Sequence, residues 1–300
     1  MELKMKTKDY FSDDVQILDI RRDNVFKAVF TRETPESQGA LSRLVSALIG
    51  YEVSIVTIVA NEPPIENLYD RQIRFDISCR TENGERVNVE MSLNPDPLEL
   101  VRLEYYAGRL FTSQDIKGIK KSYKDLKFSY QIAILANERF FNDDLFFHTF
   151  EYCDFNNRVR FNGRSRIITI ELSKLDKIVE KPTEEMSYPE LWATFFQYLT
   201  DESKRSIIYE IMEKEEGIAM ASEVLYKVSQ DEIEEAYQLS RLKYELDNQS
   251  RMTYAWEEGL EEGMQQGMQQ GKLEACEAIA AKLKSMGLSE EQIAQATGIH

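Results

Sequence analysis

Apolar and polar residues alternate along the first part of the chain with two periods, one typical of helices and one typical of strands. Phe26, Val29 and Phe30 stand at helical spacing and predict a helix that starts at Asp23. Runs rich in β-branched residues predict strands. On these patterns we expect helices at residues 23–30, 40–48 and 98–115, and strands at 53–59, 73–93 (a hairpin), 130–135, 158–161 and 167–172. Pro35 and Gly39 should separate the first two helices. The predicted class is α/β, a mixed central sheet flanked by helices.

The pattern changes after Pro182, where helical periods continue without a strand signal. We expect a sheet-containing domain over residues 1–180, a helical subdomain over 181–250, and an acidic helical tail over 251–300 that ends in a helical hairpin. Glycines recur in the tail every four residues, at Gly259, Gly263, Gly267 and Gly271. They would form a slowly drifting stripe on a helix, which suits either a homo-oligomer formed through the tail or a flexible helical linker.

The most informative stretch is the hairpin around Glu82-Asn83-Gly84. Asn-Gly between alternating segments is a strong hairpin signal. A three-residue loop would put Gly84 in a left-handed conformation and pair Asp76 with Glu90. A two-residue turn would shift the register by one and place these two carboxylates on opposite faces. Ser92 shares the face of Glu90 in either case, because side chains alternate along a strand.

Two carboxylates opposite one another on paired strands are normally unfavourable. They are explained if a divalent cation lies between Asp76 and Glu90. The alternative is an edge hairpin whose acidic residues are solvated, since charged side chains are mostly exposed. The metal interpretation therefore depends on the register of the turn.

Several motifs resemble one nuclease family. Asp76 followed by Glu90 on a hairpin resembles the PD-(D/E)xK nuclease superfamily. Residues 23–30 (Asp-Asn-Val-Phe-Lys-Ala-Val-Phe) resemble the D-x-x-F-K-x-x-F helix of the recombination-promoting nuclease or transposase family, and residues 87–91 resemble its N-V-E-M-Q segment. The next family block is matched in spacing by Arg102, Tyr105, Tyr106, Leu110, Ser113, Gln114, Gly118 and Tyr123. The order of these motifs is more specific than any one of them.

The resemblance implies a restriction-endonuclease-like core and a metal-dependent DNA endonuclease. Such an enzyme would hydrolyse phosphodiester bonds of double-stranded DNA in the bacterial cytoplasm and be linked to recombination or mobile elements. Mg²⁺ held by two carboxylates would neutralise charge and lower the pKa of the attacking water. The expected ligands are Asp76, Glu90 and a backbone carbonyl near Met91, and oxygen ligands suit Mn²⁺ as well. Asp23 is a third acidic candidate, although an acid at a helix N-terminus also favours the macrodipole.

One position departs from the family pattern. The family usually carries Gln two residues after the motif Glu, and wider relatives carry Lys, but this chain has Ser92. Serine is neutral and shorter, although its hydroxyl can still position a water molecule. Arg102 on the following helix is the nearest candidate for a replacement cation. The alternative function is a catalytically degenerate nuclease fold that binds DNA or protein.

The net charge of −16 is unusual for a DNA-binding protein, but its distribution is uneven. Residues 201–300 carry 10 basic and 21 acidic residues, a net charge of −11 that leaves only −5 for residues 1–200. The first part contains two basic clusters, which suit either a phosphate backbone or solvated faces. They are Lys117, Lys120, Lys121, Lys124 and Lys127, and Arg158, Arg160, Arg164 and Arg166. Lys27 could also reach phosphate, and Gln114 could orient DNA or simply pack.

Other classes of protein are poorly supported. His148 and His300 are the only histidines, and no glycine-rich nucleotide-binding loop is present. No apolar stretch approaches the length of a membrane span, so no membrane partner is expected. Three scattered cysteines have no metal-binding spacing and fit a reducing cytoplasm.

Overall fold

The computed structural model describes residues 18–59, 76–114, 116, 122–228 and 230–287, together with positions 289, 293 and 296. The chain forms two units, Met1–Gln238 and Leu239–His300, which we describe separately. The first contains the sheet and helices α1 to α6. The second contains most of the last helix, α7 (Gln230–Ser285).

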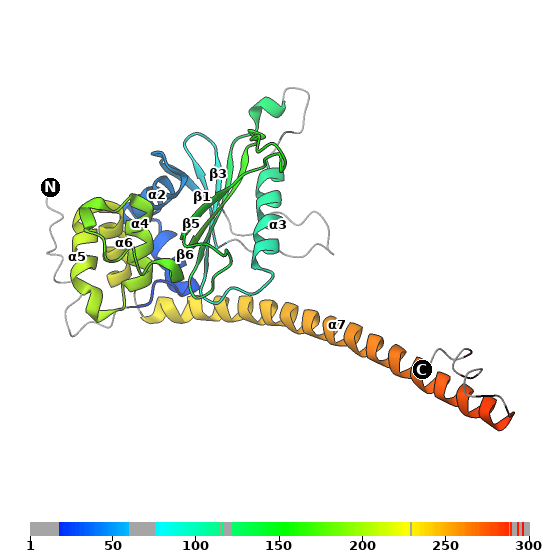
Figure 1. Ribbon diagram of the computed structural model, residues 1–300. Helices are drawn as coiled ribbons and strands as arrows, with labels where there is room; N and C mark the ends of the chain where they lie inside the picture. The colour runs from blue at the N-terminus through cyan, green and yellow to red at the C-terminus, as the bar shows by residue number, and fades with distance from the viewer. Residues whose placement is uncertain are drawn as a thin grey trace. The chain divides into compact units, whose positions relative to one another are not determined.

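A mixed sheet forms the centre of the first unit (Figure 1). In the described part of the chain it has six strands in the order β1-β2-β3-β4-β6-β5. Neighbours β1–β2, β2–β3 and β5–β6 are antiparallel, whereas β3–β4 and β4–β6 are parallel. The strands are β1 (Ile55–Val59), β2 (Ile77–Thr81), β3 (Arg86–Ser92), β4 (Ser129–Leu135), β5 (Phe147–Phe150) and β6 (Ser165–Glu171).

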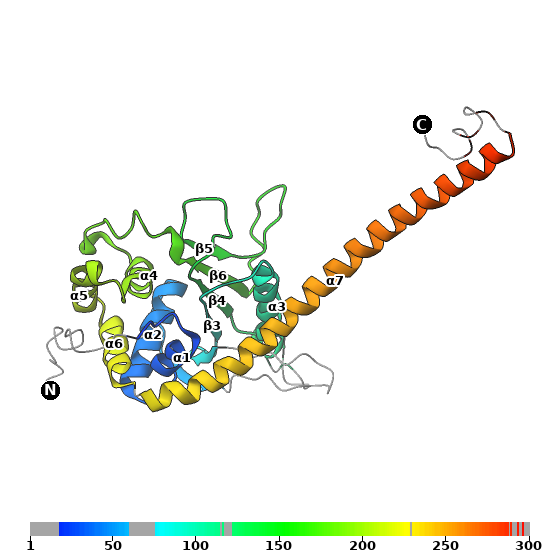
Figure 2. The same cartoon turned by 90° about the horizontal axis from the view of Figure 1, so that it is seen from below.

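Helices cover both faces of this sheet, as Figures 1 and 2 show from two directions. On one face α3 (Glu99–Thr112) packs through Leu103 against Ala133 and Leu135 of β4. The main core lies on the other face, where Phe26 and Trp192 are fully buried. Its helices are α1 (Asp23–Phe30), α2 (Pro35–Ile49), α4 (Tyr188–Tyr198), α5 (Arg205–Lys214) and α6 (Glu216–Lys227). The prediction of a mixed sheet flanked by helices, with a helical C-terminal region, is confirmed.

The predicted start of the second helix is wrong, because α2 begins at Pro35. Proline fits the first turn of a helix, where its missing N–H is not needed. The Thr34 side chain caps this end by accepting a hydrogen bond from the Ser37 backbone N–H at 3.2 Å. Gly39 lies inside the helix because α6 packs closely there: an added Cβ would lie 2.6 Å from Sδ of Met220.

The strand predicted at residues 158–161 is also wrong. The antiparallel neighbour of β6 is β5, which the sequence pattern did not reveal. Residues 158–161 belong to a turn structure between these two strands, and one isolated bridge joins Cys153 to Arg160. Positive φ angles at Arg158 (54°) and Asn162 (56°) interrupt the extended backbone, so Asn162-Gly163 does not join two paired strands.

The helices after Pro182 share the hydrophobic core of the sheet. Phe196 of α4 contacts Phe26 and Phe30 of α1, with ring centroids 5.9 and 6.4 Å apart. Sequence alone suggested boundaries at residues 180 and 250, and this three-part division stays a prediction. The structure divides the chain between Gln238 and Leu239.

The second unit consists of the helix α7 and a short turn at its end. The glycines at 259, 263, 267 and 271 lie within this helix, and a Cβ added at any of them would meet nothing within 4 Å. Self-association through the tail stays a prediction. The expected terminal helical hairpin falls largely outside the described residues. No described helix combines the length and the apolar character that crossing a membrane requires.

Candidate active site

The hairpin between β2 and β3 has the register expected for a three-residue loop. Ile77 pairs with Val89, and the backbone N–H of Gly84 donates to the carbonyl of Thr81 at 2.9 Å. Gly84 has a φ of 80°, the left-handed conformation that glycine adopts most readily. The same register continues to place Asp76 opposite Glu90. The alternative two-residue turn is therefore wrong.

Both carboxylates are buried, Asp76 immediately before β2 and Glu90 near the end of β3. Asp76 is 0 % and Glu90 is 2 % exposed, and β1 covers the outer edge of β2. A solvated edge hairpin is therefore excluded. Burying a carboxylate costs several kcal/mol, because the group loses its hydration, unless hydrogen bonds and opposite charges compensate. The surroundings of these two side chains must supply that compensation.

Helix α1 supplies a cation to Asp76. Nζ of Lys27 lies 3.2 Å from Oδ1 of Asp76 and 3.0 Å from Oδ1 of Asp23. Asp23 and Lys27 stand one helical turn apart, so both point toward the hairpin from the same face of α1. The backbone N–H of Met91 also donates to Oδ2 of Asp76 at 3.1 Å. The start of α1 and the end of β3 together hold this carboxylate in place.

Glu90 is oriented mainly by neutral donors. Its Oε1 accepts hydrogen bonds from the Asp76 backbone N–H at 3.1 Å and from Nδ2 of Asn88 at 2.9 Å. The same Asn88 nitrogen donates to Oε1 of Gln131 on β4 at 2.9 Å. Asn88 and Gln131 are fully buried, and sequence analysis overlooked both. The available signal was a polar residue within each of two otherwise apolar strands.

Helix α3 brings a second cation near Glu90. Nη2 of Arg102 lies 2.7 Å from Oε1 and 2.9 Å from Oε2 of Glu99, whose side chain is buried. Burial would lower the pKa of Arg102, but the carboxylates of Glu99 and Glu90 outweigh it and raise the pKa. Arg102 therefore stays charged beside the site. Ser92 ends β3, two residues after Glu90, and is half-buried.

The donor types of this site suit a hard divalent cation, but its three acidic residues are not a close group: in the described part of the chain only Asp143, His148 and Glu171 offer three ligand atoms within 4.8 Å of one another. Asp76, Glu90 and Asp23 offer carboxylate oxygens, which are the ligands that Mg²⁺ and Mn²⁺ prefer. The ammonium of Lys27 contacts the carboxylates of Asp23 and Asp76, so these two groups already bind one positive charge. Met91 adds a backbone carbonyl on the adjoining residue of β3.

A second acidic cluster is a less suitable metal site. Among the described residues, Asp143, His148 and Glu171 offer ligand atoms within 4.8 Å of one another. However, Nζ of Lys174 lies 3.0 Å from Oδ1 of Asp143 and 2.6 Å from Oε2 of Glu171. Burial would lower the pKa of Lys174, but these carboxylates raise it. The cluster is an ion-pair network that fastens the loop before β5 to the end of β6.

The predicted DNA-contacting residues are spread over several environments. Lys27 belongs to the site itself. Gln114 is buried. Its Nε2 donates to the Lys127 carbonyl at 3.0 Å, and its Oε1 accepts from the Lys127 backbone N–H at 2.8 Å. Lys124 is exposed in the short helix η2 (Tyr123–Asp125). The three remaining lysines lie outside the described residues: Lys117, Lys120 and Lys121. A DNA contact for any of these residues stays a prediction.

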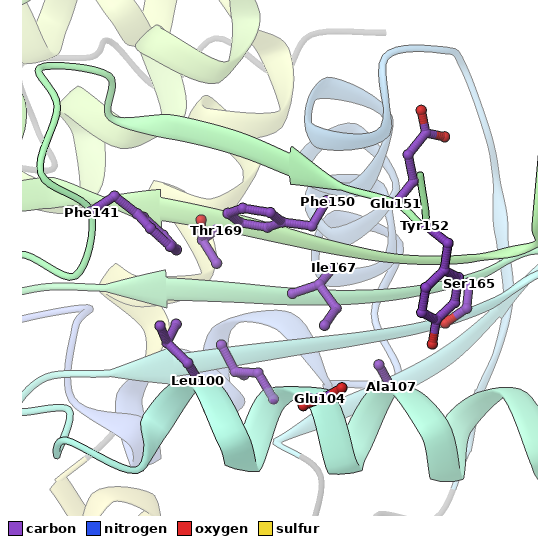
Figure 3. A pocket seen from close by; sticks show the side chains of 11 residues that line it. Leu100, Glu104, Ala107, Phe141, Phe150, Glu151, Tyr152, Ser165, Ile167 and Thr169 are labelled. Carbon is purple, nitrogen blue, oxygen red and sulfur yellow. The ribbon is translucent and has the colours of Figure 1, made fainter. Parts of the chain in front are cut away.

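A pocket of about 280 Å³ opens between α3 and the β5–β6 edge, as Figure 3 shows. Leu100 and Leu103 line it from α3, and Phe150 and Ile167 line it from the strands. Its charged lining is acidic rather than basic, so it does not fit a phosphate group. It lies on the same face of the sheet as Asn88 and Gln131, because Gln131 pairs with Ile167.

The fold and the carboxylates on its central hairpin define an α/β protein of the restriction-endonuclease type. More specifically, the chain belongs to the PD-(D/E)XK nuclease family transposases, whose family model matches residues 20–255. This match runs from the residues before α1 into α7. Comparison with curated proteins and with solved structures gave no match. Family membership supports a role as a nuclease in the biology of mobile elements.

Proposed function

We propose that this protein is a metal-dependent endonuclease that hydrolyses phosphodiester bonds of double-stranded DNA in recombination or mobile-element biology. The observation that carries the proposal is the buried pair of Asp76 and Glu90 at opposed positions of β2 and β3, with Lys27 in contact with Asp76. Buried carboxylates that are held by directed hydrogen bonds suit metal-assisted phosphodiester hydrolysis.

The ligands proposed for Mg²⁺ or Mn²⁺ are Asp76, Glu90 and the backbone carbonyl of Met91, with Asp23 beside them. When bound, the ion would neutralise phosphate charge and lower the pKa of a coordinated water. The Asn88 amide and the Asp76 backbone N–H hold Oε1 of Glu90 and thereby fix the plane of its carboxylate. This orientation keeps the two ligands from swinging apart, which is how supporting residues usually tune a metal site.

Lys27 is the group best placed to replace the cation that Ser92 lacks. Its ammonium is within 3.2 Å of Asp76, and its side chain is 26 % exposed, so it can turn toward a phosphate at the surface. Arg102 provides a second, permanently charged group near Glu90. Ser92 can position a water molecule through its hydroxyl. Together, Lys27 and Arg102 supply the positive charge, and Ser92 the water-positioning group, that Gln or Lys provides at this position in the family.

The second candidate function is a degenerate nuclease fold that binds DNA or a protein. Ser92 favours it, because serine supplies no charge near the scissile phosphate. The contacts of Lys27 also favour it, because the ammonium balances part of the acidic charge without any metal. The two candidates differ in whether phosphodiester bonds are broken.

Nicking of supercoiled plasmid separates them. The protein is assayed with Mg²⁺, with Mn²⁺ and with chelator, alongside Asp76→Asn and Glu90→Gln. The matched control is Asp144→Asn, which removes an acidic side chain that is 84 % exposed and outside the site. Metal-dependent nicking that is lost in both site variants and kept in the control supports the nuclease. Folded wild-type protein that binds the plasmid but leaves it intact with either metal would instead identify a binding module.

A further inference from the structure

The segment that links β5 to β6, residues 151–164, forms a projecting arm. Its two sides are held by hydrogen bonds from the Asp154 N–H to the Val159 carbonyl (2.8 Å) and from the Phe161 N–H to the Tyr152 carbonyl (2.9 Å). The carboxylate of Asp154 builds the turn by accepting hydrogen bonds from the Asn156 and Asn157 backbone N–H groups at 2.8 and 3.2 Å. Bonds from Asn157 and Asn156 lower the pKa of Asp154. The arm is therefore an ordered element, and both of its acidic residues are used internally, Asp154 in the turn and Glu151 in ion pairs with Arg160 and Arg166.

Large apolar side chains project from this arm into solvent. Phe155 is 93 %, Phe161 is 73 % and Tyr152 is 64 % exposed. The rings of Tyr152 and Phe161 meet edge to face with centroids 6.3 Å apart, so they form one small aromatic surface. Contiguous exposed apolar surface of this kind commonly marks an interaction site.

The arm is also basic in an acidic protein. Residues 151–166 contain Arg158, Arg160, Arg164 and Arg166 against only Glu151 and Asp154, a net charge of +2 in a chain of net charge −16. Arg164 donates to the Lys124 carbonyl at 3.2 Å and so joins the arm to the exposed lysine of η2. This local charge is complementary to a polyanion.

The aromatic surface begins on the same face of the sheet as the candidate active site. Asn88, which holds Glu90, lies beside Gln131 of β4, and Gln131 lies beside Ile167 of β6. Ile167 in turn lies beside Phe150 of β5. Phe150 and Tyr152 both line the pocket of Figure 3. Three strand spacings separate Asn88 from Phe150, a distance of roughly 14–15 Å. Glu90 itself is level with Thr169 and His148, so the arm, which continues past Phe150, lies toward the other end of these strands. A nucleic-acid strand that reached both places would span several nucleotides.

We propose that the arm binds unpaired nucleotides of the DNA substrate. Bases stack on Phe155, Phe161 and Tyr152, and Arg158 contacts the adjoining phosphate, whereas Arg160 pairs with Glu151 within the arm. Aromatic side chains between arginines suit single strands because every base has a face that can stack, whereas a closed duplex offers mainly phosphates. The proposal rests on the proposed nuclease function and specifies its substrate: DNA with an unpaired segment several nucleotides from the cleavage site.

The test is fluorescence anisotropy with a labelled oligo(dT) single strand and a labelled hairpin duplex. Chelator is present throughout, so that binding is measured without cleavage. Full-length wild type is compared with Phe155→Ser/Phe161→Ser and with Arg158→Ala. The controls are Val56→Ser, which removes an exposed apolar side chain on β1, and Lys177→Ala, which removes an exposed charge. Sedimentation of every variant reports its oligomeric state.

We expect the double aromatic variant to bind oligo(dT) at least roughly tenfold more weakly than wild type, with an unchanged salt dependence. Arg158→Ala should reduce the slope of log affinity against log salt by about 0.7, the value for one phosphate contact on a single strand. Both controls should match wild type. Duplex binding should change less than single-strand binding in the aromatic variant.

Three results would overturn the proposal: wild type that does not bind oligo(dT), arm variants indistinguishable from the controls, or an aromatic variant that changes oligomeric state while keeping its DNA affinity. The last result would assign the aromatic surface to a protein partner. Plasmid nicking by the same proteins separates the two proposals. Wild type that binds oligo(dT) through the arm but never nicks DNA would remove the nuclease and leave the arm as a DNA-binding element.

Discussion

Lys27→Met should make the protein less stable without divalent cations and more responsive to them. The lost ammonium lies 3.2 Å from Asp76, a carboxylate that is 0 % exposed. Breaking a fully buried ion pair from one side costs ~3–5 kcal/mol. Because the Lys27 side chain is 26 % exposed, water can replace part of the contact. We therefore expect a loss of about 1–3 kcal/mol, or roughly 3–10 °C in Tm for a unit of this size.

Mg²⁺ should recover this loss if Asp76 and Asp23 are metal ligands. An ion that binds only the folded state stabilises it by about 2.7 kcal/mol at a hundred times its Kd. In the variant the ion no longer competes with an ammonium for the two carboxylates. Addition of Mg²⁺ should therefore raise the Tm of Lys27→Met by more than it raises the Tm of wild type.

Differential scanning calorimetry with chelator and with Mg²⁺ measures both effects. Lys177→Met is the matched control, because Lys177 pairs with Asp144 where both side chains are 84 % exposed. The double variant Lys27→Met/Asp76→Asn removes both charges and should lose the enhanced response to Mg²⁺. An equal rise in Tm for wild type, Lys27→Met and the double variant would refute the reasoning, since the ion would then act elsewhere.

Three further changes test other parts of the structure. Asn88→Leu should lower the free energy of unfolding by about 1–3 kcal/mol in urea titrations, because two buried acceptors, on Glu90 and Gln131, lose a donor; no change would show that the amide is dispensable. Gly217→Ala should cost about 1–3 kcal/mol, since the new Cβ would lie 2.4 Å from Cβ of Arg43; a neutral result would mean that α2 and α6 can separate freely. Burial raises the pKa of Glu190, but bonds from Lys181 and from the α4 N-terminus lower it below 4.5 overall. Its stabilisation is present above that pH and is lost as pH falls through the lowered value, so Glu190→Gln should flatten the acid limb of stability below pH 4.5.

The central hairpin could be predicted because its register depends on local sequence. A loop of three residues ending at Gly84 leaves one pairing for the strands on either side, and side-chain alternation then fixes which carboxylates meet. The sequence predicted the hairpin but left a second, two-residue turn open, which would have put Asp76 and Glu90 on opposite faces. The observed pairing of Ile77 with Val89 decides between the two registers.

The rest of the site depends on contacts between distant segments. Asn88 holds Glu90 in concert with Gln131, and this contact exists only because β4 lies beside β3. Periodicity could not reveal that order of strands. Lys27 was expected as a phosphate contact, and its ion pair with Asp76 depends on how α1 meets the end of the hairpin. The strand β5 was missed because its four residues carry too little pattern to identify a strand.

The proposed metal centre can be weighed against a degenerate site by the charges of the residues around it. Asp23, Asp76, Glu90 and Glu99 contribute four negative charges when ionised, whereas Lys27 and Arg102 contribute two positive charges. A fold that had abandoned catalysis would gain stability by replacing buried carboxylates with apolar or amide side chains, because buried ion pairs are often less stabilising than such replacements. In the proposed nuclease, a bound cation would account for two carboxylates that are almost fully buried and held by directed hydrogen bonds, which the stability of the sheet alone does not require.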